Sequence, residues 1–233
     1  MSNRIYYTDP QCIEFDAVVS ATTRLDGRPA VALDTTAFYP TSGGQPQDTG
    51  MLSDARVVDV VESDTGDLWH VLDRDVEVGR RVHGVVDWPR RFDHMQQHTG
   101  QHILSAALDR LSHARTVGFH LGALVSTVDL SVDLPAQAIA AAESEANRIV
   151  WEDRPVAIRF VGEAEVATLP LRKEPERGGT LRVIDVDGYD LSACGGTHVS
   201  RTGAVGLIAV RSAERLRGGT RLEFVGGGRA LRS

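Results

Sequence analysis

The sequence predicts an α+β protein in which a small β-barrel precedes a larger domain of strands and two long helices. Over the first 88 residues, short segments rich in β-branched side chains alternate with glycine-containing turns, which is typical of strands. After Pro89 the apolar side chains recur every three or four residues, which is the period of a helix. This change of period divides the chain into two predicted domains, 1–88 and 89–233.

The N-terminal domain is expected to be a barrel because its strands are short and evenly separated. Residues 13–19 and 56–61 partly alternate between apolar and polar side chains, as in a half-buried strand. Glycine-containing pairs separate such segments, at Asp26-Gly27, Gly43-Gly44, Thr65-Gly66 and Val78-Gly79. Many short strands joined by tight turns indicate a small barrel or sandwich.

The second domain contains the two predicted helices, residues 89–111 and 135–151. Each begins with a proline, which is tolerated in the first turn of a helix. Strands are predicted between and after them, at 124–132, 156–161, 181–186, 205–210 and 220–225, with a turn at Gly218-Gly219. Because strands and helices are interspersed, we expect an α+β domain with a mixed or antiparallel sheet.

The composition is that of an ordinary globular protein, with 233 residues, 42% hydrophobic and 24% charged. No apolar run approaches the length needed to span a bilayer, which argues against a membrane protein. The first ten residues lack the apolar core of a signal peptide, so we expect a cytoplasmic protein. The two cysteines, Cys12 and Cys194, cannot form a disulfide framework, and a cysteine beside other donors is then a candidate ligand or nucleophile.

Charge is unevenly distributed along the chain, whose net charge is −7. Residues 1–75 hold 13 acidic and 5 basic side chains, whereas residues 201–233 hold seven arginines against Glu214 and Glu223. A basic segment on an acidic protein can still contact phosphate locally. The candidates are these arginines together with Arg172, Lys173 and Arg177.

Two segments carry side chains suited to binding a metal ion. His98 and His102 are four positions apart on the first predicted helix, so both rings lie on the same side. The later segment Cys194-Gly195-Gly196-Thr197-His198 offers a thiolate and a third imidazole, and its glycines allow a tight fold. Together they form a Cys-His₃ set suited to tetrahedral Zn²⁺. Taken singly, a helical histidine pair is often a coincidence, and Cys194 alone is most simply a small core residue.

Residues 91–102 and 192–198 closely resemble the alanyl-tRNA editing protein family, whose members are freestanding relatives of the editing domain of alanyl-tRNA synthetase. Residues 38–50 resemble the glycine-rich segment of that family's N-terminal barrel, and residues 217–224 resemble its C-terminal part. The resemblance covers nearly the whole chain in the same order. It implies that one Zn²⁺ is held by four residues: His98, His102, Cys194 and His198.

The resemblance implies a trans-acting deacylase for tRNA(Ala) mischarged chiefly with serine, with glycine as a further candidate. Hydrolysis of an aminoacyl ester needs an attacking water, a stabilised oxyanion and a protonated leaving hydroxyl. Four protein ligands would close a tetrahedral site, so zinc either gains a fifth ligand, or holds one donor loosely, or only positions the substrate. No nucleotide cofactor is expected, because the chain lacks a P-loop.

Gln101 and Thr197 lie next to predicted ligands and are candidate catalytic residues. They could orient water or bind the serine hydroxyl, or else Gln101 occupies the helix surface and Thr197 caps a turn. The candidate substrate-binding residues Gly43 and Gly44 have three interpretations. Their backbone N–H groups cradle the tRNA end, or they shape the substrate pocket as the family resemblance suggests, or they form only a β-turn.

Three alternative functions follow from the same residues. Another zinc-dependent ester or amide hydrolase is one, although the helix lacks the glutamate of the His-Glu-x-x-His proteases. A tRNA-binding module with a structural zinc is the second. The third is the related threonyl-type editing architecture, against which the segment 194–198 and the N-terminal barrel favour the alanyl type.

Overall fold

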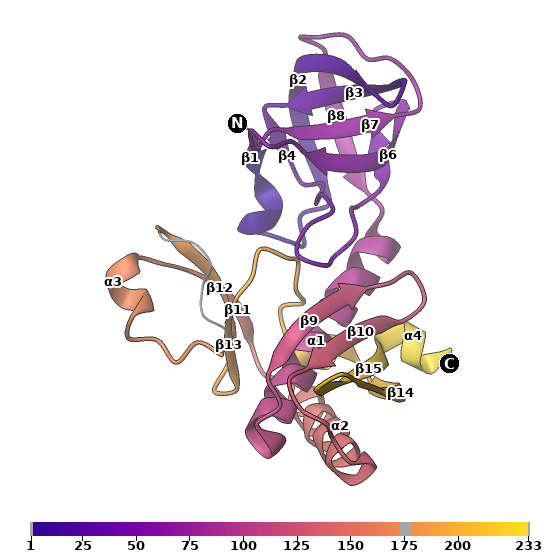
Figure 1. Ribbon diagram of the computed structural model, residues 1–233. Helices are drawn as coiled ribbons and strands as arrows, with labels where there is room; N and C mark the ends of the chain where they lie inside the picture. Colours follow the sequence, from indigo (N-terminus) through magenta and orange to yellow (C-terminus); the bar gives the residue numbers. More distant parts are fainter. Residues whose placement is uncertain (1, 173–178, 233) are drawn as a thin grey trace. The chain divides into compact units, whose positions relative to one another are not determined.

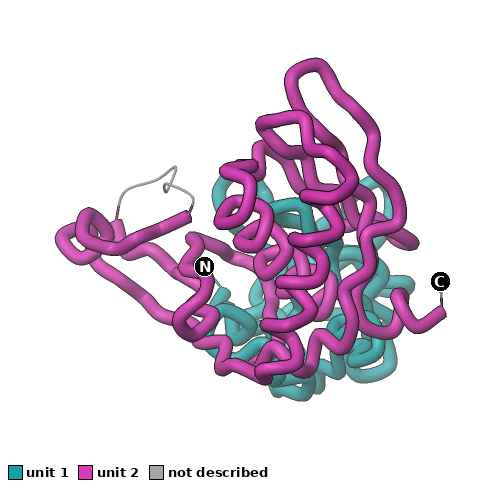
Figure 2. The backbone as a smooth tube through the Cα atoms, turned by 90° about the horizontal axis from the view of Figure 1, so that it is seen from below, with its two compact units in different colours: residues 1–92 teal, residues 93–233 magenta. Residues whose placement is uncertain are grey.

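The computed structural model describes residues 2–172 and 179–232, so the predicted phosphate contacts Lys173 and Arg177 lie outside the described residues. The chain divides into two compact units, residues 1–92 and 93–233, which Figure 2 shows in different colours. The first contains a closed barrel, and the second contains two antiparallel sheets and the helices. The predicted fold class, α+β with an N-terminal barrel, is therefore confirmed.

Six strands of unit 1 close into the barrel in the order β2-β3-β7-β6-β5-β8, with every neighbouring pair antiparallel. These strands are β2 (Glu14–Leu25), β3 (Arg28–Leu33), β5 (Gly50–Leu52), β6 (Ala55–Glu62), β7 (Leu68–Leu72) and β8 (Arg81–Val86). Alternate side chains point inward and form a buried apolar core that includes Phe15, Val31, Leu33, Leu52, Val57 and Leu72. Strands β1 (Asn3–Arg4) and β4 (Thr35–Thr36) pair beside η1 (Ile5–Tyr7), a short 3₁₀-helix.

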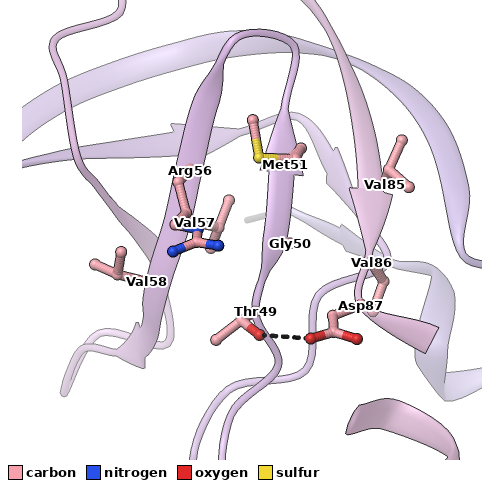
Figure 3. A pocket seen from close by; sticks show the side chains of 9 residues that line it. All are labelled: Thr49, Gly50, Met51, Arg56, Val57, Val58, Val85, Val86 and Asp87. Carbon is pink, nitrogen blue, oxygen red and sulfur yellow. Dashed lines mark hydrogen bonds between the residues drawn. The ribbon is translucent and has the colours of Figure 1, made fainter. Parts of the chain in front are cut away.

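The short strand β5 lies between β6 and β8, and a hollow of about 490 Å³ is lined by residues of all three strands. Figure 3 shows Arg56 on β6 and Thr49, which directly precedes β5 and donates a hydrogen bond to Asp87 across 3.5 Å. The remaining lining is apolar, from Met51, Val57, Val58, Val85 and Val86, with Gly50. None of the predicted site residues lines this hollow.

Unit 2 contains a four-stranded antiparallel sheet in the order β14-β15-β10-β9. Its strands are β9 (Thr116–Leu121), β10 (Ser126–Leu130), β14 (Ile208–Leu216) and β15 (Gly219–Gly226). The two long helices are α1 (Trp88–Ser112), which begins in unit 1 and continues in unit 2, and α2 (Ala136–Trp151). Apolar side chains of one face of the sheet, such as Val128, Leu222 and Phe224, are buried.

Two buried amide side chains attach the long helices to this sheet. The Gln97 amide on α1 donates to the carbonyl of Gly226 across 2.9 Å and accepts from the Gly226 N–H across 2.7 Å. Asn147 on α2 makes the equivalent pair of bonds with Ile208 across 2.8 and 2.9 Å. Because each amide satisfies both backbone groups of a strand end, it fixes its helix in register with the sheet. The turn of α1 that contains Gln97 also carries His98.

The second sheet of unit 2 is three-stranded and antiparallel, in the order β11-β12-β13 (Figure 1). It consists of β11 (Val156–Val161), β12 (Leu181–Val186) and β13 (Asp190–Ala193). The shorter elements of this unit are α3 (Glu163–Val166), η2 (Thr202–Val205) and α4 (Gly227–Leu231). Cys194 follows β13 directly, so this sheet places the second half of the predicted metal site.

The element boundaries agree with the predicted ones in most places. Strands β11 and β12 coincide with the predicted segments 156–161 and 181–186, and α2 begins one residue after Pro135. One difference occurs near a glycine. The strand predicted at 205–210 begins only at Ile208, as β14, because residues 202–205 form a 3₁₀-turn. None of the described helices is both long and apolar enough to cross a lipid bilayer.

Candidate metal centre

His98, His102, Cys194 and His198 come together in unit 2, with their donor atoms all within 4.8 Å of one another. Cys194 Sγ lies 3.4 Å from His98 Nε2 and 3.3 Å from His198 Nε2. The ring centroids of His98 and His102 lie 4.4 and 4.7 Å from that of His198. The structure thus places the two sequence segments at one point.

These donors fit a tetrahedral metal ion. Bonds of about 2.3 Å to sulfur and about 2.0–2.1 Å to nitrogen would hold a sulfur and a nitrogen about 3.5 Å apart at the tetrahedral angle. The two Sγ–Nε2 distances are close to that value. The three histidines are buried and Cys194 is partly buried. The group could therefore hold a metal ion without large movement of any side chain.

Hydrogen bonds to the outer nitrogens orient two of the rings. His102 Nδ1 donates to Asp190 Oδ2 across 3.1 Å, because an ionised carboxylate can only accept. His198 Nδ1 lies 3.1 Å from Thr99 Oγ1, which also accepts from the Val199 N–H. Each contact leaves Nε2 as the nitrogen that faces the other donors, which is the usual arrangement around a metal-binding histidine.

Asp190 is itself held on both carboxylate oxygens. Arg172 Nε donates to Oδ1 across 2.6 Å, and Ser192 Oγ donates to Oδ2 across 2.9 Å. Burial of the Asp190 side chain would raise its pKa, but His102 and Arg172 hold the pKa of this carboxyl well below its usual range. Asp190 is therefore ionised and able to accept from His102 at neutral pH.

The ionisation states of two donors favour metal binding. Burial acts to raise the pKa of the Cys194 thiol, but the neighbouring His98 and His198 lower it well below its usual value. The Gly196 N–H also points at Sγ across 3.3 Å. Burial and the neighbouring His98 lower the pKa of His198 to about 3, so this ring is neutral. A thiolate and a neutral imidazole are the forms that bind metals.

The candidate catalytic residues also lie in the interior of unit 2. Gln101 is 5% exposed, and its amide nitrogen donates to Ser105 Oγ across 2.7 Å, one turn further along α1. Ser105 accepts a second bond from Thr116 Oγ1 across 2.8 Å. Thr197, which stands between Cys194 and His198 in the sequence, is fully buried. Gln101 therefore does not lie on the exposed surface of the helix.

Gly43 and Gly44 form the tip of a tight turn in unit 1. Ser42 and Gln45 on either side exchange two backbone hydrogen bonds, of 3.0 and 2.9 Å. The φ angles of the two glycines are 56° and 82°, a pair of left-handed conformations that a two-residue hairpin turn requires. The backbone is therefore that of the β-turn interpretation, with Gly43 exposed at its tip.

Many of the candidate phosphate-binding arginines are engaged in ion pairs. Arg172 pairs with Asp190 at the metal centre. Within residues 201–232, four arginines contact an aspartate, in the pairs Arg201–Asp153, Arg215–Asp133, Arg221–Asp129 and Arg229–Asp93. A paired arginine adds less positive potential to the surface than a free one. The net positive charge of this segment thus overstates the basic surface that it presents.

Sequence reasoning missed the residues that orient the ligands. Asp190, Ser192 and Cys194 alternate along β13 and its extension, and this period of two could have placed all three on one face. Thr99 offered no such signal, since it resembles the other small residues of the α1 core. Its role depends on His198, which is 99 positions away.

Comparisons with known proteins identify similar sequences along most of the chain. A family model described as "tRNA synthetases class II (A)" matches residues 13–90, and one described as "Threonyl and Alanyl tRNA synthetase second additional domain" matches residues 181–223. The alanyl-tRNA editing protein AlaX-M of Methanosarcina acetivorans is 33% identical over 229 residues, which cover 90% of this chain and 92% of the relative.

Two longer relatives contain a similar region. The alanyl-tRNA editing protein AlaX-L of Pyrococcus horikoshii is 35% identical over 99% of this chain, and the chain spans 59% of that protein's length. An alanine–tRNA ligase of Ignicoccus hospitalis is 36% identical over 98% of the chain, which corresponds to 26% of the ligase. With similarity along nearly all of AlaX-M, this chain belongs to the alanyl-tRNA editing protein family.

Proposed function

We propose that this chain is a Zn²⁺-dependent aminoacyl-tRNA deacylase that hydrolyses tRNA(Ala) mischarged with serine, and with glycine as a second substrate. The observation that carries the proposal is the buried Cys-His₃ group, in a chain whose relatives are named alanyl-tRNA editing proteins. One thiolate and three imidazoles at tetrahedral spacing favour Zn²⁺ over Mg²⁺ or Ca²⁺, which prefer oxygen ligands.

The proposed ligands of one Zn²⁺ per chain are His98, His102, Cys194 and His198. When bound, the ion supplies a Lewis acid that can polarise an ester carbonyl or anchor a substrate amino group. The surrounding residues keep the donors fixed: Asp190 holds the His102 ring, and Thr99 contacts the His198 ring. A site held in this way needs little reorganisation during the reaction.

Gln101 is proposed to recognise the serine hydroxyl. Ser105 accepts from one N–H of its amide, which leaves the carbonyl oxygen and the second N–H for a substrate, and the carbonyl oxygen is the group that can accept from a hydroxyl. Serine can donate to that oxygen, whereas alanine has no hydroxyl and would leave it unpaired. Such a site discriminates against the analogue that lacks the group, by up to about 10⁴–10⁵ in the strongest cases. Thr197, which is buried and stands next to His198 in the sequence, is proposed to orient the reacting water or ester.

Gly43 and Gly44 are proposed to bind the substrate through their backbone. Gly43 is exposed at the tip of its turn, and a Cβ there would meet no atom within 4 Å. Glycine is therefore favoured at this position by the left-handed φ of the turn and not by a lack of space. Backbone N–H groups of such a turn suit a phosphate or carbonyl oxygen of the tRNA end.

The test is deacylation of Ser-tRNA(Ala), Gly-tRNA(Ala) and Ala-tRNA(Ala) by one protein sample whose metal content is measured. We expect release of serine and glycine, sparing of alanine, and about one zinc per chain. A chelator should abolish the activity, while the circular dichroism spectrum should remain that of the folded protein. Binding of tRNA without deacylation would instead support a structural zinc, and turnover of simple esters without Ser-tRNA(Ala) would support another ester hydrolase.

A further inference from the structure

The Arg172 side chain points into unit 2 toward the metal centre. Its side chain is 15% exposed, and Nε and Nη2 reach the two oxygens of Asp190 across 2.6 and 3.4 Å. The backbone N–H of Arg172 donates to the carbonyl of Leu191 across 3.0 Å, so the main chain is also fixed beside β13. Both the side chain and the backbone of Arg172 therefore form hydrogen bonds with β13, the strand that precedes Cys194.

A continuous chain of hydrogen bonds connects Arg172 through Asp190 to His102, one of the proposed metal ligands. Asp190 Oδ2 accepts hydrogen bonds from Ser192 Oγ and Arg172 Nη2, and it also accepts one from His102 Nδ1. Because a guanidinium meets a carboxylate as a planar fork, it restrains the rotation of that carboxylate. Ser192 contacts only Oδ2 and cannot supply this restraint.

We infer that Arg172 is a positioning residue for the metal centre, acting through Asp190 on the orientation of the His102 ring. This inference rests on the metal-binding part of the proposed function and not on the identity of the substrate. It replaces a phosphate contact as the role of Arg172. A phosphate contact would need a guanidinium that reaches solvent, whereas the Arg172 guanidinium forms an ion pair with a buried carboxylate.

The first measurement is the Zn²⁺ affinity of the full chain, obtained by competition with a chromophoric chelator. Substitutions behind a metal ligand weaken metal binding by about 10- to 100-fold, and we expect Asp190→Asn in that range and Arg172→Gln near its lower end. The matched control is Arg159→Gln. Arg159 pairs with Asp185 across 3.2 Å in the same sheet, but that pair contacts none of the proposed ligands, so its removal should leave the affinity unchanged.

The second measurement separates an indirect role from general damage. If Arg172 acts only through Asp190, the double variant Arg172→Gln/Asp190→Asn should bind Zn²⁺ no more weakly than Asp190→Asn alone. Additive losses of affinity would overturn the inference. Should Arg172→Gln fail to fold, Arg172→Lys takes its place, because lysine keeps the charge but cannot form the fork. It should still bind Zn²⁺ more weakly than the wild type.

The third measurement compares the positioning role with the phosphate contact. The salt dependence of tRNA(Ala) binding should be the same for Arg172→Gln and the wild type, whereas loss of a phosphate contact would reduce the slope by about one. An unchanged Zn²⁺ affinity, or a reduced salt slope, contradicts the inference. Loss of Zn²⁺ affinity in a chain that does not deacylate Ser-tRNA(Ala) would overturn the proposed function and leave the role of Arg172 standing.

Discussion

Arg91 and Asp48 form an ion pair in which neither side chain is exposed to solvent. Arg91 Nε lies 3.1 Å from both carboxylate oxygens, and the other nitrogens donate to the carbonyls of Pro10 and Ala37 across 2.6 and 2.5 Å. Asp48 also accepts from the Tyr39 N–H across 2.6 Å, at the base of the segment whose tip is Gly43-Gly44. One guanidinium at the start of α1 thus joins three separate segments of unit 1.

Replacement of Arg91 by alanine should destabilise unit 1 strongly. It leaves the Asp48 carboxylate buried without its partner, which typically costs about 3–5 kcal/mol. Chemical denaturation followed by circular dichroism measures this free energy. The control is Arg74→Ala, which removes an exposed arginine paired with Asp73 and should change the unfolding midpoint little. Equal effects of the two substitutions would show that the buried pair does not stabilise the unit.

Substitution of a proposed ligand should remove the metal. Cys194→Ser replaces a thiolate by a hydroxyl that stays protonated at neutral pH, so we expect less than a tenth of the wild-type zinc after dialysis. Elemental analysis of the dialysed protein measures it. His120→Ala is the matched control, because His120 is an exposed histidine on β9 outside the group. A Cys194→Ser protein with full zinc content would exclude the thiolate as a ligand.

Removal of the metal should lower the stability of the protein. The ion would join His98 to Cys194, which are 96 positions apart, and would bind only the folded chain. Free zinc at a thousand times its dissociation constant would stabilise the fold by about 4 kcal/mol. Thermal unfolding at increasing free zinc should show a rising midpoint. A midpoint that does not depend on zinc would mean that the group binds no ion in solution.

Gln101→Leu tests recognition of the serine hydroxyl. The substitution keeps a side chain of similar size but removes the acceptor, so Ser-tRNA(Ala) deacylation should fall about 10- to 100-fold, the range expected for one buried hydrogen bond. Zinc content should stay constant, which separates this effect from damage to the metal centre. Gln137→Leu, at an exposed position of α2, serves as the control. Normal activity of Gln101→Leu would assign recognition to another group.

His70 should make the stability of the protein depend on pH. It is fully buried, with one ring nitrogen 3.1 Å from the Val31 carbonyl and the other 2.8 Å from Thr36 Oγ1. Burial lowers the pKa of His70 to about 4, below the usual value of about 6.5 in an unfolded chain. Between these two pH values only the unfolded chain takes up the proton. The free energy of unfolding should therefore decrease as the pH falls from 6.5 to 4, by up to about 1.4 kcal/mol per pH unit.

The measurement is urea unfolding of wild type and His70→Gln at several pH values between 4.5 and 7.5. The variant lacks the His70 imidazole, so its stability should vary less over the same interval. The other histidines are common to both proteins, and the difference between the two curves isolates His70. Parallel curves would show that this ring takes up its proton equally in the folded and the unfolded chain.

The grouping of the four proposed ligands could be predicted from the sequence because each half of the group is local. His98 and His102 share one helical face, and Cys194 and His198 are four positions apart across a short glycine-containing segment. The barrel and the long helices were likewise visible in the period of the apolar side chains. The supporting contacts are different, because Asp190 meets His102 across 88 positions and only the fold brings them together.

Arg172 illustrates the same limit. In the sequence it stands beside Lys173 and resembles part of a basic surface. Only the fold brings it to a buried carboxylate, because Asp190 lies on β13, 18 positions further along the chain. The turn at Gly43-Gly44 was predictable as a turn, since glycine pairs favour left-handed backbone, but a turn signal does not identify a ligand.

The separation of the two metal-binding segments sets an order of events during translation. The ribosome completes residues 1–92 and the histidines of α1 long before it reaches Cys194, 96 positions after His98. Translation proceeds at a few residues per second or faster, so the barrel has several seconds to fold before Cys194 and His198 are synthesised. The proposed capture of zinc is therefore a late step, and a nascent chain stalled before residue 194 would carry a folded barrel and only two of the four proposed ligands.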